Sequence, residues 1–266
     1  MINIGFIGTG NMGTAIIKGI SKSNLSSKLS VFATDLDIAK LEALKDFGVT
    51  PLEDTIEVCK KCKYVLLAVK PQMFDDLLDS IAPYVTEQTV IISIAAGITA
   101  EYIKSKTIAN ARVILVMPNT PLLLGEGATA LSKSEPVTDE EFSLVCEIFS
   151  SSGKASIISS DKMKEIIAIN GSSPAFIYLF AKGFIDYARE QGINENVAKT
   201  LFSQSLIGSA KMITDSGYTI DELIKMVSSP GGTTLMGLDE LYKGNLTQVV
   251  EKACEACTKR AYELSK

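Results

Sequence analysis

The sequence contains no histidine among its 266 residues, and it has only three arginines, Arg112, Arg189 and Arg260. Without histidine there is no mixed Cys/His metal site. A dehydrogenase that oxidises an alcohol commonly needs a group that titrates near neutral pH to accept the hydroxyl proton, and histidine is the usual one. In this chain a lysine or tyrosine must accept that proton, or the reaction of the substrate must need little acid–base catalysis.

Cysteine is sparse too, with five residues, one of them Cys146. The other four form two CxxC pairs, Cys59 with Cys62 and Cys254 with Cys257, which lie in opposite halves of the chain. Each pair falls in a stretch predicted to be helical, whereas zinc sites prefer cysteines in knuckle turns. We therefore expect reduced structural thiols and no metal site, with a metal or redox role as the alternative.

Long apolar runs and clusters of positive charge are also missing. The net charge is −5 and the basic residues are dispersed, so we expect neither nucleic acid nor a membrane surface as a partner. No run is long enough to span a membrane, and no basic segment precedes the first apolar run, as a signal peptide would require. We expect a cytoplasmic globular protein that acts on a small molecule.

The first fifteen residues organise the rest of the sequence. An apolar run from Ile2 to Ile7 predicts a buried parallel strand, and the turn GTGNMG follows it directly, before a helical stretch with one apolar face. This strand, Gly-x-Gly-x-x-Gly and helix arrangement is typical of dinucleotide sites. Gly8 permits the tight turn, Gly10 lets the backbone approach a pyrophosphate, and Gly13 lets the helix pack closely on the strand. An ordinary strand-to-helix turn is the alternative.

Further apolar runs predict β-strands separated by helices, a pattern that indicates a parallel sheet covered on both faces. After Lys162 the strand pattern stops and long amphipathic helices replace it. The predicted strands span residues 2–7, 29–34, 64–69, 90–94 and 112–117, the predicted helices of the first part include 37–47 and 54–62, and those of the last part include 174–191, 195–216 and 246–265.

The predicted fold class is α/β, with an N-terminal doubly wound, Rossmann-like, mostly parallel sheet followed by an all-helical C-terminal domain. We place the boundary near Ser160, which gives a dinucleotide-binding domain, 1–160, and a helical substrate-binding and dimerisation domain, 161–266. Helices as apolar as FIYLFAKGF lack enough predicted neighbours to cover them. A dimer interface in the helical domain is therefore expected.

In a doubly wound sheet, ligands bind beyond the carboxyl ends of the strands. Four of the five loops there are rich in Gly, Pro, Ala or Asn, which permit close backbone approach or supply hydrogen bonds. The candidate cofactor-binding residues in these loops are Gly8, Thr9, Gly10, Asn11, Met12, Gly13, Thr34, Asp35, Ala68, Val69, Lys70, Pro71, Ala95, Ala96, Gly97 and Asn119.

Two charged residues among these candidates each have two interpretations. Asp35 lies about twenty residues beyond Gly13, where an acid can accept a hydrogen bond from the ribose 2′-hydroxyl of NAD and would repel the 2′-phosphate of NADP. Alternatively, Asp35 caps the next helix together with Asp37. Lys70 follows a buried strand and is expected either to contact the cofactor or to be a solvated strand end.

A second polar cluster, VSSPGGTT at 227–234, precedes the helical stretch LMGLDELYKG. Hydroxyls and a Pro-Gly-Gly turn at a helix N-terminus suit a small anion. Because arginine is so scarce, backbone N–H groups are the expected contacts for a carboxylate. The stretch NGSSP at 170–174 has a similar, weaker pattern, and a plain helix start explains it equally well. The candidate substrate-binding residues are Ser228, Ser229, Gly231, Gly232, Thr233 and Thr234.

Six motifs in this order resemble the pyrroline-5-carboxylate reductase family over essentially the whole chain. They are GFIGTGNMG, AVKPQ at 68–72, SIAAGIT at 93–99, VMPNTP at 116–121, GSSPAF at 171–176 and VSSPGGTT, the last being specific to that family. The resemblance implies NAD(P)H-dependent reduction of the cyclic imine pyrroline-5-carboxylate to L-proline. It also implies NADPH or NADH as cofactor, with NADPH usual, and a homodimer formed through the helical domain that often assembles into a decamer.

Carried over by position, the resemblance assigns the pyrophosphate to Gly8–Gly13, the nicotinamide half to Ala68–Pro71 and Ala95–Gly97, and the substrate carboxylate to Gly231–Thr234. The Thr234 hydroxyl would lie near the imine nitrogen, as the catalytic residue. Three positions depart from the family pattern: Asp35, where many members have Ser, Asn or Arg; Thr55, where an Asn often touches the adenosine side; and Leu115, which replaces a common Arg. An imine that is already electrophilic needs positioning more than a strong acid, which agrees with a site that lacks histidine.

Two other functions fit parts of the sequence. A β-hydroxyacid dehydrogenase would use a catalytic lysine and a nearby asparagine after the cofactor domain, and Lys164 and Asn170 have that spacing, but this class does not explain VSSPGGTT. A non-catalytic dinucleotide-binding regulator would bind cofactor without turnover and would need no second polar cluster.

Overall fold

The computed structural model describes residues 1–265, which form two compact units. Unit 1 comprises Met1–Pro174 together with the residues from Glu255 onward, and unit 2 comprises Ala175–Cys254. Each unit is described by itself below. The predicted domains, 1–160 and 161–266, are defined by what each is expected to bind. Their boundary near Ser160 stays a prediction.

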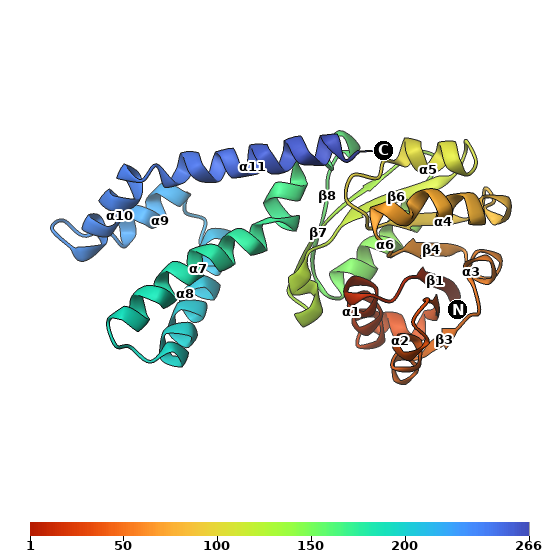
Figure 1. The fold of residues 1–266 in the computed structure, drawn as a ribbon, viewed down its shortest axis with the longest axis horizontal. Coiled ribbons are helices and arrows are strands. Elements are labelled where there is room, and N and C mark those ends of the chain that lie inside the picture. Colours follow the sequence, from red (N-terminus) through yellow and green to blue (C-terminus); the bar gives the residue numbers. More distant parts are fainter. Residues whose placement is uncertain (266) are drawn as a thin grey trace. The chain divides into compact units, whose positions relative to one another are not determined.

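Unit 1 is built on one eight-stranded sheet with the order β3-β2-β1-β4-β5-β6-β7-β8 (Figure 1). All neighbouring strands are parallel except β6 and β7, which are antiparallel. The predicted mostly parallel, doubly wound sheet is therefore confirmed. The strands are β1 (Ile2–Ile7), β2 (Leu29–Thr34), β3 (Val49–Pro51), β4 (Tyr64–Leu67), β5 (Val90–Ser93), β6 (Arg112–Met117), β7 (Gly127–Lys133) and β8 (Gly153–Ile157).

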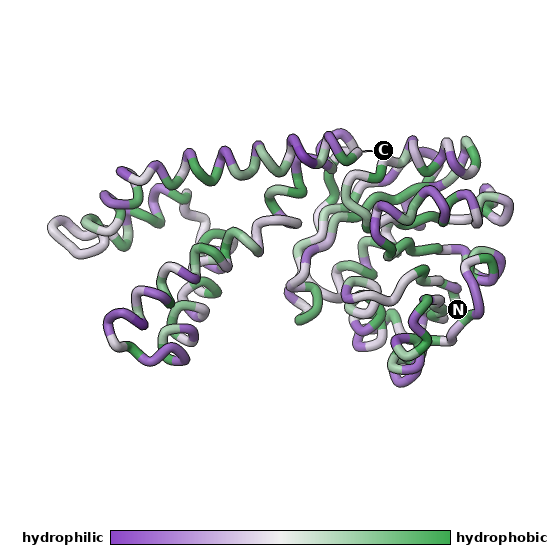
Figure 2. The backbone as a smooth tube through the Cα atoms, viewed as in Figure 1, coloured by the Kyte–Doolittle hydropathy of each residue, from purple (hydrophilic) through white to green (hydrophobic). Residues whose placement is uncertain are grey.

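Helices cover both faces of the sheet. One hydrophobic core joins the sheet to α1 (Asn11–Ser21) and α6 (Asp139–Ser150), and a second core joins it to α3 (Thr55–Lys61), α4 (Phe74–Ile81) and α5 (Ala100–Lys106). The central strands are buried on both faces, so successive side chains of both orientations are apolar. Figure 2 shows mostly hydrophobic colour along the central strands of unit 1.

The sequence prediction missed β3, β7 and β8, and it made one helix too long. β3 has only three residues, too few for a clear apolar pattern. β7, with the sequence GATALSK, mixes small and polar residues. It runs antiparallel to β6, and strands in antiparallel pairs need no continuous apolar run. The predicted helix 37–47 is instead α2 (Ile38–Glu42) followed by a 3₁₀ turn at Lys45–Phe47. The other predicted strands and helices are present within a few residues of their predicted bounds.

Unit 2 contains only helices, as expected. They are α7 (Ser173–Glu190), whose first residues belong to unit 1, α8 (Glu195–Asp215), α9 (Ile220–Met226), α10 (Thr233–Lys243) and the first part of α11 (Leu246–Glu263). Stacked rings of Phe184 and Phe202, with centroids 4.3 Å apart, join α7 to α8. Many large apolar side chains nevertheless stay exposed, including Leu179 at 71% and Leu201 at 64%.

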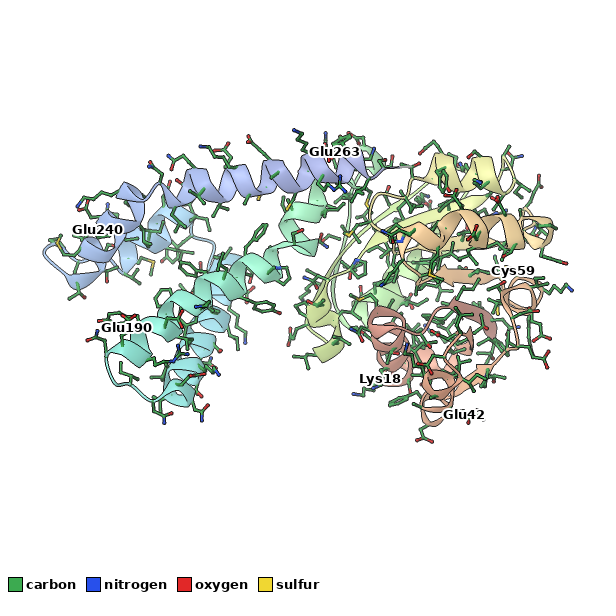
Figure 3. All side chains as sticks on the ribbon, viewed as in Figure 1. Lys18, Glu42, Cys59, Glu190, Glu240 and Glu263 are labelled. Atoms are coloured by element: carbon green, nitrogen blue, oxygen red, sulfur yellow. The ribbon has the colours of Figure 1, made fainter. Side chains whose placement is uncertain are left out.

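All five cysteines are free thiols. Cys59, which lies on α3 (Figure 3), and Cys62 are buried. Burial raises the pKa of Cys59 to about 11 and that of Cys62 to about 12, so both remain protonated and unreactive at neutral pH. These two thiols are part of the core, as the sequence predicted.

Candidate active site

Three glycines shape the turn between β1 and α1, and each meets a different constraint. Gly8 has a φ of 97°, and a Cβ atom there would stand 2.8 Å from the carbonyl oxygen of Ala68. A Cβ on Gly13 would stand 2.5 Å from the carbonyl oxygen of Gly8. No atom lies within 4 Å of the position that a Cβ on Gly10 would take. Gly8 and Gly13 therefore pack the turn, while Gly10 leaves open space beside the backbone.

The N-terminus of α1 is free to bind an anion. Its N-cap, Gly10, supplies no side-chain hydrogen bond, and no acidic residue occupies the first turn. The N–H groups of that turn therefore lack the partners that caps usually provide, and the helix dipole favours negative charge there. Together with the open space at Gly10, this arrangement fits the pyrophosphate of a dinucleotide.

Asp35 binds the glycine-rich turn directly. Its Oδ2 accepts hydrogen bonds from the Thr9 backbone N–H at 2.5 Å and from the Thr9 hydroxyl at 2.9 Å, and its Oδ1 accepts one from the Asp37 N–H at 2.9 Å. Burial alone would raise the pKa of this carboxyl, but the hydrogen bonds from Asp37 and Thr9 outweigh it and lower the pKa. Asp37, whose carboxylate accepts from the Ala39 N–H, is the cap of α2. The side chain of Asp35 is thus a fixed negative charge beside the turn.

The remaining predicted cofactor residues of unit 1 follow adjacent strands. Because β2, β1, β4, β5 and β6 are parallel neighbours, their carboxyl ends lie at one edge of the sheet. Backbone hydrogen bonds tie the first of these ends together: Gly8 N–H donates to Thr34, and Ala68 N–H donates to Ile7. Thr55 begins α3, just after β3. That edge holds Thr34, Asp35, Gly8–Gly13, Ala68–Pro71, Ala95–Gly97 and Asn119, and their contacts with a cofactor stay a prediction.

Two buried asparagines join β6 to the segment that precedes α7. The side chain of Asn119 donates to the Asn170 carbonyl at 3.1 Å and accepts from the Ala128 N–H at 2.9 Å. Asn170 in turn donates from its Nδ2 to the carbonyls of Met117 at 2.7 Å and Ala128 at 3.0 Å. Both side chains thus hold the backbone around the end of β6, a structural role that the sequence did not predict.

A cavity of about 310 Å³ opens beside the ends of β5 and β6. Its walls come from the predicted nicotinamide loop, from β7 and from the segment after β8, and they are rich in hydroxyl groups. The sequence predicted Ala95 and Gly97 as site residues, but not the lining from the start of α5, from the end of β7 or from the segment after β8. The lining residues include Ser93, Ala95, Gly97, Leu115, Met117, Ser132, Ser160, Met163 and Lys164.

The predicted substrate loop belongs to unit 2, where it ends α9 and begins α10. Gly231 has a φ of 72°, and the Gly232 N–H donates to the Ser229 carbonyl at 2.9 Å, which closes a tight turn. The hydroxyl of Ser228 already donates to the Ile224 carbonyl at 2.6 Å. As in α1, the N-cap of α10, Gly232, supplies no side-chain hydrogen bond and the first turn has no acidic residue. Thr233 and Thr234 are exposed at this N-terminus.

Among residues 1–265, no helix combines the length and apolarity needed to cross a bilayer. Within residues 1–265, no group of three or more cysteine, aspartate or glutamate side chains is arranged to hold a metal ion.

Comparison with known proteins gives matches over the whole chain. Residues 160–264 match the family model for pyrroline-5-carboxylate reductase dimerisation, and residues 3–97 match that for NADP oxidoreductase coenzyme F420-dependent. A pyrroline-5-carboxylate reductase of Pisum sativum is 33% identical over 262 residues, which cover 98% of this chain and 96% of the relative.

Solved structures agree with these matches. A pyrroline-5-carboxylate reductase from Coxiella burnetii matches with a TM-score of 0.92 and 31% identity, over 100% of this chain and 99% of that one. A pyrroline carboxylate reductase of Plasmodium falciparum with NADP bound has a TM-score of 0.90 and 29% identity, over 100% and 98% of the two chains.

The doubly wound sheet, the glycine-rich turn with its free helix N-terminus, and the helical C-terminal region define a dinucleotide-dependent oxidoreductase. Within this class, the chain belongs to the pyrroline-5-carboxylate reductase family.

Proposed function

We propose that this protein reduces 1-pyrroline-5-carboxylate to L-proline with NADPH or NADH, the final step of proline biosynthesis. Full-length similarity to named reductases carries this proposal. When bound, the reduced nicotinamide supplies the hydride for the C=N bond. The glycine-rich turn and the N-terminus of α1 would hold the pyrophosphate, and Ala68–Pro71 and Ala95–Gly97 would flank the nicotinamide half.

The substrate loop has the chemistry that this reaction needs from the protein. The exposed N–H groups at the start of α10 would bind a carboxylate, and the Thr234 hydroxyl would hydrogen-bond to the imine nitrogen and orient it. A protonated imine is already an electrophile, so binding and orientation contribute more than a strong general acid. This explains how a chain without histidine can catalyse the reaction.

The active form is a homodimer built through the helical region, and a decamer is the larger assembly we propose. The match to the dimerisation model over residues 160–264 and the exposed apolar side chains of α7 and α8 support a dimer. We further propose a cytoplasmic location, because five unpaired thiols suit a reducing compartment.

The direct test is a spectrophotometric assay of the purified protein with pyrroline-5-carboxylate and each reduced cofactor. We expect imine-dependent oxidation of NADPH or NADH and formation of L-proline. A β-hydroxyacid dehydrogenase would instead oxidise a hydroxy acid with the oxidised cofactor, and a non-catalytic regulator would bind cofactor without turnover. Either of those results would refute the proposal.

Asp35 is expected to disfavour NADPH relative to NADH. Its lowered pKa keeps the carboxylate charged at neutral pH, close to where the adenosine ribose of a dinucleotide lies. The variant Asp35→Asn keeps the shape and removes the charge that would repel a 2′-phosphate. The ratio of kcat/KM for NADPH to that for NADH should rise about tenfold, a change of about 1.4 kcal/mol.

The matched control for this test is Asp37→Asn. Asp37 is two residues away, is exposed, and caps α2, a role that asparagine fills equally well. The same change of charge there should leave the cofactor ratio within about twofold of wild type. A ratio that Asp35→Asn leaves unaltered would restrict Asp35 to holding Thr9.

A further inference from the structure

The backbone at the end of α11 lies directly against the predicted nicotinamide loop, residues 95–97. A Cβ atom on Gly97 would stand 3.2 Å from the carbonyl oxygen of Leu264 and 3.4 Å from its carbonyl carbon. Gly97 also has a φ of 81°, a conformation that residues with a side chain rarely adopt. The contact between the two backbones is therefore one that glycine favours on both counts.

The side chain of Tyr262 fastens the same end of α11 to a second wall of the cavity. Its hydroxyl donates to Glu165 Oε1 at 2.8 Å, and the Lys164 Nζ lies 4.5 Å from the centroid of its ring. Both partners belong to the segment after β8, whereas Gly97 follows β5, and β6 and β7 lie between those two strands. Gly97 and Lys164 both line the cavity. The end of α11 thus joins two cavity walls that come from separate strands.

Tyr262 and Leu264 belong to one hydrogen-bonded turn, so fixing the first residue also fixes the second. The Leu264 N–H donates to the Arg260 carbonyl at 3.0 Å, and the Ser265 N–H donates to the Tyr262 carbonyl at 3.2 Å. Ala261, in the same turn, is buried. This turn, the nicotinamide loop and the segment after β8 all belong to unit 1, so these contacts lie within one compact unit.

We propose that Tyr262 is a positioning residue for the cofactor, because it holds the end of α11 against Gly97 and so keeps the nicotinamide loop in the conformation that receives the nicotinamide half. This inference rests on the proposed function and extends it. A loop that contains glycine has many conformations open to it, and ordering it on binding costs affinity. Contacts that fix the loop in the free protein remove that cost. The adenosine half of the cofactor, which is predicted to bind beyond β1 and β2, gains nothing from them.

The test compares the binding of NADH with that of ADP-ribose, which is the same molecule without the nicotinamide ring. Because Tyr262→Ala removes both the hydrogen bond and the ring contact, it should raise the Kd of NADH about tenfold and leave the Kd of ADP-ribose within about twofold of wild type. Calorimetric titration measures both constants without turnover. Tyr262→Phe keeps the ring over Lys164 and loses only the hydroxyl, so its Kd for NADH should lie between those of wild type and Tyr262→Ala.

Two results would overturn the inference. One is a Kd for NADH that Tyr262→Ala leaves unchanged. The other is a Kd for ADP-ribose that rises as much as that for NADH, because an equal loss would mean that Tyr262 supports the fold of the whole unit and does not act on the nicotinamide loop.

Glu263→Ala is the matched control. Glu263 (Figure 3) is the next residue of the same turn, and its carboxylate pairs with Arg260 of the same helix at 2.9 Å. Both side chains of this pair are exposed, so the variant should bind both ligands like wild type. If wild type binds neither reduced cofactor and lacks imine reductase activity, the proposed function fails and the role of Tyr262 fails with it. If wild type is active and Tyr262→Ala binds NADH equally well, only the role of Tyr262 fails.

Discussion

Replacing Gly10 with alanine is expected to weaken the binding of NADPH and NADH about 10- to 100-fold while the protein stays folded. The open space beside Gly10 can accept a Cβ atom without a clash, and its φ of −62° is allowed for alanine. The methyl group would occupy the space through which the pyrophosphate reaches the N–H groups at the start of α1. Losing one or two charge-assisted hydrogen bonds accounts for a change of this size. Calorimetric titration with each cofactor measures it.

Gly13→Ala is the informative companion, because the same added methyl group has a different effect there. Its Cβ would stand 2.5 Å from the Gly8 carbonyl oxygen, a backbone atom that cannot move aside without distorting the turn. We expect a loss of about 1–3 kcal/mol in the free energy of unfolding, measured by chemical denaturation without cofactor. Gly10→Ala should unfold like wild type in the same experiment. Wild-type affinity for both cofactors in Gly10→Ala would contradict a pyrophosphate site at this turn.

The sequence predicts the central strands well because each is buried on both faces. A strand such as β4, YVLL, has no polar position to interrupt its apolar run, so length and composition suffice to predict it. β7 has a parallel neighbour on one side and an antiparallel one on the other, and its sequence, GATALSK, carries small and polar residues. The position of β7 in the sheet depends on its pairing with β6 and β8, so no local sequence pattern predicts it.

The same distinction holds for the site. A backbone feature such as the glycine-rich turn is visible in sequence, because glycine is required wherever a Cβ would collide. The direction in which a side chain points cannot be read from the sequence. The sequence left open whether Asp35 accepts a hydrogen bond from a ribose hydroxyl or caps α2, and it did not predict that the Asp35 Oδ2 accepts from Thr9. The cavity beside Lys164 likewise depends on β7 lying next to β6.

The largest loss of turnover is expected for Thr234→Val, a substitution that keeps the shape of the side chain and removes its hydroxyl. Thr234 is the second residue of α10, it is exposed, and its hydroxyl makes no hydrogen bond with the residues that the structure describes. The group is therefore available to the imine nitrogen. Removing one hydrogen-bond donor that acts on the reacting atoms should lower kcat by roughly 100-fold. The Kd of NADPH should not change, because the predicted cofactor-binding residues all lie in unit 1.

Thr247→Val provides the matched control, because Thr247 is likewise the second residue of an exposed helix, α11, and its hydroxyl interacts only with Gln248 within the described residues. Any general cost of valine near a helix N-terminus should appear equally in both variants, as a small shift in the denaturation midpoint. Only Thr234→Val should lose turnover. A kcat within about twofold of wild type would mean that the imine nitrogen is oriented by another group, and the exposed N–H groups at the start of α10 would then be the next candidates.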